Sequence, residues 1–243
     1  QMRKLCLIVW GVFFTLHTFA QFHLDARLSN NHLWRGIEVA DGMVVTSDLS
    51  YTFLKGHVCA GFWGGTNTTG QYKEFNNHLS FQVKGLSLAF WDTYNFSPQA
   101  TYNNKEFFNY KASETGRFLD AIVSYRFEGK FPVYISWSTI IFGRDRNQSN
   151  TANKYSSFCY VEYPLYTKKG WRVDAGAGGG FALNRAGESN HFYGTKPGIV
   201  HVSMKVARTV SLGGYKIPVH VCMVWNPQAN QAYYQVVAQI ILL

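Results

Sequence analysis

The sequence predicts an all-β fold, a single closed antiparallel transmembrane β-barrel of about 12 strands with short turns at one rim and longer loops at the other. Three observations lead to this prediction. Apolar and polar residues alternate with a period of two along most of the chain, which is typical of strands with one apolar and one polar face. Short glycine-bearing turns and longer polar stretches alternate between these strands. Tryptophan and tyrosine gather near the predicted strand ends.

The amino end has the pattern of a secretory signal peptide. Residues 2–4 are Met-Arg-Lys, residues 5–16 are mostly apolar, and the small residue Ala20 precedes Gln21. This pattern predicts cleavage after Ala20, so residues 1–20 form the signal peptide and residues 21–243 form one barrel domain. The apolar run is shorter than the roughly 20 residues of a membrane-spanning helix, and no later segment reaches about 18 consecutive apolar residues.

Alternation begins directly after the predicted cleavage site. From Phe22 to Ser29 every other residue is apolar and each residue between is polar. A strand with this pattern has one face toward an apolar phase and one toward water. The same alternation recurs in the segments 45–53, 74–83, 119–127, 171–177, 200–206 and 234–242.

The connections between strands fall into two classes. Short turns with glycine lie near 54–56, 84–85, 128–130, 167–170 and 212–214. Longer polar stretches lie near 30–42, 66–71, 97–116, 144–154, 184–198 and 226–231. Because the two classes alternate, they predict hairpins with periplasmic turns at one rim and extracellular loops at the other. Strands of about 9 to 13 residues are long enough to cross a hydrocarbon layer when tilted by roughly 40°.

Charge and cysteine content exclude other classes of protein. Lysine and arginine number 23 against 14 acidic residues, and removal of Arg3 and Lys4 with the signal leaves 21 against 14. The basic residues are scattered and form no nucleic-acid motif, so we expect no nucleic-acid partner. Cys59, Cys159 and Cys222 are far apart in sequence, which argues against a disulfide framework or a metal site. We expect no metal and no cofactor.

A secreted β-sandwich or a lipocalin-like barrel is the alternative fold, because its strands also alternate. The ionic residues on the polar face and the aromatic residues at strand ends favour a membrane barrel instead. The tryptophans expected at the membrane interface are Trp34, Trp63, Trp91, Trp137, Trp171 and Trp225.

One motif near the predicted mature start is distinctive. Residues 29–36 read Ser-Asn-Asn-His-Leu-Trp-Arg-Gly, which resembles the S-N-x-x-W-R-G signature of a family of porin-like outer-membrane β-barrels from Gram-negative bacteria of the Bacteroidota type, with one more residue between Asn30 and Trp34. Looser likeness extends to Glu162-Tyr163-Pro164, a glycine-rich stretch at 176–180 and Trp225-Asn226-Pro227. The resemblance implies a barrel in contact with outer-membrane lipids and the barrel assembly machinery. It implies little about a substrate.

Arg35 interrupts the apolar pattern within this motif. A guanidinium that faces lipid near the midplane costs about 2–4 kcal/mol, so Arg35 should face pore water or a carboxylate. The expected partners are Asp25, Glu38 and Asp48. Trp34 should then face the opposite way, toward the membrane interface, and Gly36 should allow the backbone to turn.

The strand register also predicts which ionic side chains face the lumen. The candidates are Asp25, Arg27, Arg35, Glu38, Asp48, Glu74, Asp120, Arg126, Arg172, Asp174, His201 and Lys205. Mixed signs on neighbouring strands are typical of internal salt bridges. If the lumen is open, cationic side chains would instead give it a weak preference for anions.

These patterns predict a porin-like barrel for passive diffusion of small solutes. A closed structural or adhesive barrel is the alternative, with binding in the loops near 97–116 and 184–198. A lipid hydrolase is less favoured. It would use His78 with Ser80 or His201 with Ser203, but a spacing of two is common in alternating strands, and no orienting residue accompanies either pair. We expect no catalytic residues.

Overall fold

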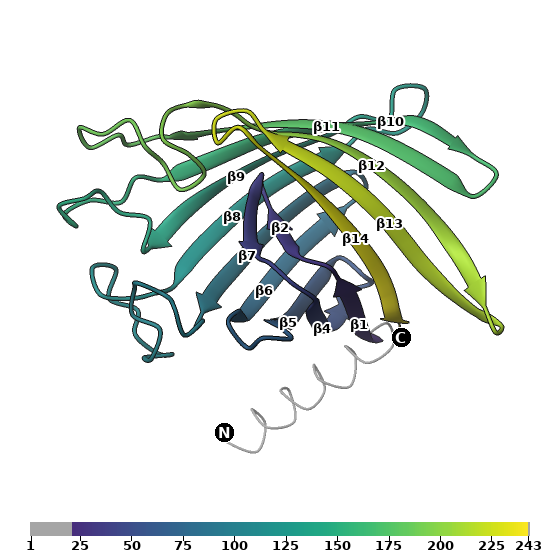
Figure 1. Ribbon diagram of the computed structural model, residues 1–243, viewed down its shortest axis with the longest axis horizontal. Coiled ribbons are helices and arrows are strands. Elements are labelled where there is room, and N and C mark those ends of the chain that lie inside the picture. The colour runs from purple at the N-terminus through teal and green to yellow at the C-terminus, as the bar shows by residue number, and fades with distance from the viewer. Residues whose placement is uncertain (1–20, 243) are drawn as a thin grey trace, which may run out of the picture.

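The computed structural model describes residues 21–242, and the predicted signal peptide, residues 1–20, lies outside the described residues. The described chain is built from strands, turns and loops (Figure 1). The strands are β1 (Gln21–Ser29), β2 (His32–Trp34), β3 (Ile37–Ala40), β4 (Val44–Phe53), β5 (Val58–Asn67), β6 (Lys73–Val83), β7 (Leu86–Asn95), β8 (Phe118–Arg126), β9 (Tyr134–Gly143), β10 (Ser156–Lys168), β11 (Trp171–Ala182), β12 (Gly198–Leu212), β13 (Tyr215–Asn226) and β14 (Gln231–Leu242). No helix in this range is long and apolar enough to cross a membrane.

Twelve of these strands form one closed barrel, in which each strand pairs antiparallel with its neighbours in sequence. The barrel closes where β1 pairs with β14, with Ser29 opposite Val237. On its other side β1 pairs with β4, with Gln21 opposite Thr52 and Ser29 opposite Val44. The predicted closed barrel of about 12 antiparallel strands is confirmed.

The outer surface of the barrel is apolar. Phe62 on β5 is 54% exposed, Phe90 on β7 is 54% exposed and Met223 on β13 is 64% exposed. These residues lie on the same outward faces as the other apolar members of each alternating strand. A continuous apolar surface of this extent is unfavourable in water and is typical of contact with hydrocarbon.

A short hairpin of β2 and β3 fills part of the interior (Figure 1). Its two-residue turn uses Arg35 with φ of 51° and Gly36 with φ of 84°, the positive values that tight hairpins need at both central positions. The hairpin begins at Asn31, whose side-chain amide donates to the Tyr234 carbonyl on β14. The long connection between β1 and β4, predicted as an extracellular loop, thus turns into the lumen.

Three of the expected interface tryptophans are in the lumen, so those predictions were wrong. Trp34 lies on the inner hairpin, and Trp63 and Trp91 line interior cavities. A tryptophan near a strand end faces lipid or lumen according to its register, and the hairpin supplies the apolar partners that make the lumen positions favourable. Trp137, Trp171 and Trp225 are each between 41% and 50% exposed on the outer face.

Candidate functional site: the barrel lumen

The hairpin crosses the lumen, and its turn is fastened to the opposite wall. Arg35 Nη2 donates to Asp120 Oδ2 on β8 at 2.5 Å, and Nη1 donates to the Tyr193 hydroxyl at 2.6 Å. The two ionic side chains are 11% and 4% exposed. Asn226, at the end of β13, donates to the Gly36 carbonyl at 3.0 Å. We call Arg35, Asp120 and Tyr193 the latch.

Aromatic rings seal the latch from water. Trp34 packs against Phe118, Phe192 and Tyr193, with ring centroids 5.4–5.8 Å apart. The Arg35 guanidinium lies 4.6 Å from the Trp34 ring centroid, a cation–π distance. Burial raises the pKa of Tyr193, so its hydroxyl stays protonated. A sealed, paired charge of this kind is costly to break, because the remaining partner is left buried and uncompensated.

The predicted partners of Arg35 were wrong. Asp25 binds Arg27, Asp48 binds His78 at 2.7 Å, and Glu38 accepts a hydrogen bond from Asn31 at 2.8 Å. The physical reason is the direction of the hairpin. It carries Arg35 away from its neighbours in sequence to a carboxylate on the far wall, 85 positions later in the chain.

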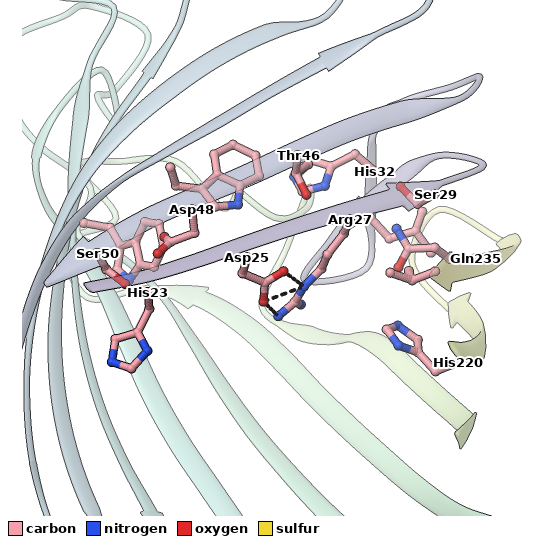
Figure 2. Close-up of a pocket in the computed structure, with 14 residues that line it drawn as sticks. His23, Asp25, Arg27, Ser29, His32, Thr46, Asp48, Ser50, His220 and Gln235 are labelled. Carbon is pink, nitrogen blue, oxygen red and sulfur yellow. Dashed lines mark hydrogen bonds and ion pairs between the residues drawn. The ribbon is translucent and has the colours of Figure 1, made fainter. Parts of the chain in front are cut away.

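The hairpin divides the lumen into three cavities. The first, of about 590 Å³, lies against β1 and β4 and is lined by His23, Asp25, Arg27 and Asp48 (Figure 2). Figure 2 shows the Arg27 guanidinium bonded to the Asp25 carboxylate. The Arg27 Nη2 and Asp25 Oδ2 atoms lie 2.6 Å apart. The Arg27 side chain is 51% exposed and the Asp25 side chain 21%. The cation is therefore the more accessible member of this pair.

A charge cluster lies at one side of the second cavity, of about 340 Å³, which Glu162, Asp174 and Lys205 line. Lys205 Nζ lies 2.9 Å from Glu162 Oε2 and 3.6 Å from Asp174 Oδ2. Arg172 Nε lies 2.8 Å from Asp174 Oδ1, and Arg126 Nη2 lies 3.7 Å from Glu162 Oε1. The cations are 32–46% exposed, whereas the carboxylates are 10% and 1% exposed. The cations are thus the more exposed members of this cluster.

Glu162 was not among the predicted lumen residues. It lies on β10 between Val161 and Tyr163, which are 44% and 36% exposed on the outer face. The alternation of apolar and polar residues around Glu162 was therefore a signal that its side chain faces the lumen. Pro164 two positions later obscured it, since a proline weakens the expectation of a strand. The register shifts between Pro164 and Tyr166.

The third cavity, of about 800 Å³, lies between the hairpin and the wall of β6–β8. Three predicted residues, Arg35, Glu74 and Asp120, line it. Glu74 accepts hydrogen bonds from the side-chain amides of Asn76 at 2.9 Å and Asn95 at 3.3 Å. Trp34, Trp63, Trp91, Tyr102, Phe118, Phe192 and Arg144 also line this cavity. Its loop residues Tyr102 and Arg144 carry no period-two signal and were missed in the sequence.

The two histidine–serine pairs do not form Ser–His hydrogen bonds among residues 21–242. His78 instead binds Asp48 and stacks on Trp91, with ring centroids 4.6 Å apart. His201 lines the second cavity beside Ser203, and its Nδ1 is buried without a described partner. Within the same range no three His, Cys, Asp or Glu side chains gather closely enough to hold a metal ion.

Comparisons with known proteins give only distant likeness. No protein-family model and no curated protein matches the sequence. Among solved structures, an outer-membrane channel from Pseudomonas putida F1 aligns with a TM-score of 0.45 and 9% identity, over 92% of this chain and 97% of that one. A bacterial polysaccharide outer-membrane secretin aligns with a TM-score of 0.34 and 10% identity, again over 92% and 97%. Likeness at this level supports no functional conclusion for this chain.

Proposed function

We propose that this protein is a channel of the Gram-negative outer membrane for small solutes, narrowed by its β2–β3 hairpin. The observation that supports it most strongly is the inversion of the barrel. Large apolar side chains cover the outside, and ionic side chains and cavities occupy the inside. This arrangement suits a wall between hydrocarbon and an aqueous path. The motif at residues 29–36 supports the same location, with outer-membrane lipids and the barrel assembly machinery as partners.

A weak preference for anions follows from the exposure of the lumen charges. Most of the lumen ions are engaged in ion pairs, so the preference rests on which charges are exposed. Arg27, Arg126 and Arg172 are 43–51% exposed, whereas their carboxylate partners are 1–21% exposed. A solute in the lumen therefore meets cationic groups first, which favours anions electrostatically.

The alternative is a closed scaffold or an adhesin whose loops bind a partner. The latch is the specific observation that favours it, because the hairpin is fixed at both ends and stands across the lumen. The two functions differ in whether ions pass when the latch is intact.

Planar-bilayer recording of the refolded protein tests both. We expect small stepwise currents from the wild type and larger steps from Asp120→Asn, because loss of the ion pair frees the hairpin turn while the barrel hydrogen bonds remain. Arg185→Ala, at an exposed loop position without a side-chain bond to any described residue, is the matched control. Absence of currents from the wild type would rule out the channel and favour the scaffold, whether or not Asp120→Asn conducts.

The reversal potential tests the preference of the channel for anions. In a salt gradient the reversal potential of the wild type should indicate anion preference, and Arg172→Gln should move it toward zero. Cation preference in the wild type would contradict the role given to the exposed arginines.

A further inference from the structure

Arg144 is a half-buried cation without an ion-pair partner in the described residues 21–242. It follows the last residue of β9, and its guanidinium lies 3.9 Å from the ring centroid of Tyr102, 5.0 Å from Phe192 and 5.3 Å from Phe118. Within residues 21–242 no carboxylate forms an ion pair with it, and its Nε is buried without a hydrogen bond. Arg117, the other arginine enclosed by rings at this rim, is paired with Asp92 at 2.7 Å.

An anion is the kind of partner that would compensate the charge of Arg144. Burial lowers the pKa of Arg144, and the nearby Tyr102, Glu74 and Asp145 oppose this shift without cancelling it. Cation–π contacts with three rings offset part of this cost. A charged group that has been desolvated and left unpaired gains most from a carboxylate or phosphate, which a guanidinium binds through two parallel hydrogen bonds.

The surroundings of Arg144 indicate what else the ligand contains. Arg144 lines the third cavity, of about 800 Å³, which is large enough for one or two sugar rings. Tryptophan and tyrosine rings offer flat faces, and amide groups offer both donors and acceptors for hydroxyls. The amide residues that line it are Gln71, Asn76, Asn95 and Gln99, and Gln71 and Gln99 lie in loops of the long-loop rim. The cavity therefore reaches that rim.

The other charges of the cavity restrict the ligand further. Asp120 is already paired with Arg35. Glu74 accepts two amide hydrogen bonds and has no cation bound to it in the described chain, so it can accept further bonds from hydroxyls. The Glu74 carboxylate would repel a second carboxylate on the ligand. The cavity thus suits a ligand with one anionic group and several hydroxyls.

We propose that this cavity binds an acidic saccharide, with the carboxylate of a uronic acid on Arg144 and its sugar ring against the aromatic wall. This goes beyond the proposed channel, because binding does not require conduction. A bilayer without currents would contradict the proposed channel but not the saccharide site. Conduction without saccharide binding would contradict the site but not the channel.

Isothermal titration of the refolded protein in detergent tests the site, with D-glucuronate, D-glucose and acetate as probes. We expect D-glucuronate to bind at least about tenfold more tightly than either D-glucose or acetate, because only D-glucuronate has both the anion and the ring. Arg144→Gln should weaken D-glucuronate about tenfold or more and leave D-glucose unchanged. Arg185→Gln, which removes an exposed loop charge, should change neither.

Two results would overturn the proposal. Equal affinity of the wild type for D-glucuronate and D-glucose would show that no anion site operates, and this needs no variant. Acetate binding as tight as D-glucuronate would show an anion site that does not recognise the sugar. If Arg144→Gln does not fold, Arg144→Lys keeps the charge but loses the paired hydrogen bonds, and D-glucuronate should still bind it more weakly than the wild type.

Discussion

Gly36 is the residue on which the position of the lumen hairpin depends. A Cβ at Gly36 would lie 2.0 Å from the Val200 carbonyl oxygen, and its φ of 84° disfavours other residues. Arg35, beside it, reaches the latch only if this turn stays close to β12. The contact between the Gly36 backbone and the wall is therefore as important as the ion pair.

Substitution of Gly36 by alanine should loosen the hairpin. We expect Gly36→Ala to cost more than about 1–3 kcal/mol, because the clash with Val200 adds to the backbone strain. Gly42→Ala is the matched control, since Gly42 has a φ of 76° and a Cβ there meets nothing within 4 Å. Urea unfolding of both variants in lipid vesicles measures the difference. Equal losses of unfolding free energy in Gly36→Ala and Gly42→Ala would show that the hairpin turn does not touch the barrel wall.

His191 should make the latch sensitive to acid. Its Nε2 is bonded to the Lys196 carbonyl at 2.9 Å, and its Nδ1 accepts the Tyr193 amide at 3.2 Å, an arrangement of the neutral ring. Burial lowers the pKa of His191, with Asp145 opposing the shift and Lys154 adding to it. Since the folded pKa lies below the ordinary value, the released loop binds the proton more readily. Stability from this contact is complete above about pH 6.5 and is lost as the pH falls below it.

Hydrogen exchange checks this expectation. After correction for intrinsic rates, amides of residues 183–197 should be less protected at pH 5.5 than at pH 7.5. His191→Gln should remove most of the difference. Protection that is unchanged between the two pH values in the wild type would contradict it.

The strand β14 shows how period two assigns faces to a whole element. Tyr234, Val236 and Ile240 are 38–62% exposed on the outside, whereas Gln235 lines the first cavity. The same rule identified β1, predicted at 22–29 and observed at Gln21–Ser29. It did not identify β2 and β3, because three and four residues are too few to show a period.

A pair of arginine substitutions tests the faces of β14. Val236→Arg should destabilise the inserted barrel by up to about 2–4 kcal/mol, since a cation would face hydrocarbon. Gln235→Arg places the same charge one residue away in the lumen and should cost about 1 kcal/mol, from the lost bond to the Asn31 carbonyl at 2.8 Å. Folding into vesicles across a urea series compares them. A larger loss from Gln235→Arg would mean that the register is shifted by one residue.

The molecule as a whole is a cylinder without free edges and with its apolar surface outside. Removal of residues 1–20 should leave a protein that is monodisperse only with detergent or lipid, because water would meet the outward side chains directly. Size-exclusion chromatography with and without detergent measures this, and heat-modifiable gel migration reports the closed barrel. A monodisperse protein in plain buffer would contradict the membrane assignment.

The sequence by itself determined the closed antiparallel barrel of about 12 strands, because alternation is a local signal that each wall strand repeats independently. Only the tertiary structure decided what the interior contains. Trp34, Trp63 and Trp91 face the lumen, and Arg35 pairs with Asp120, because a hairpin from one loop meets residues from distant strands there. Contacts of this kind depend on how separate segments meet across the lumen. No local periodicity encodes them.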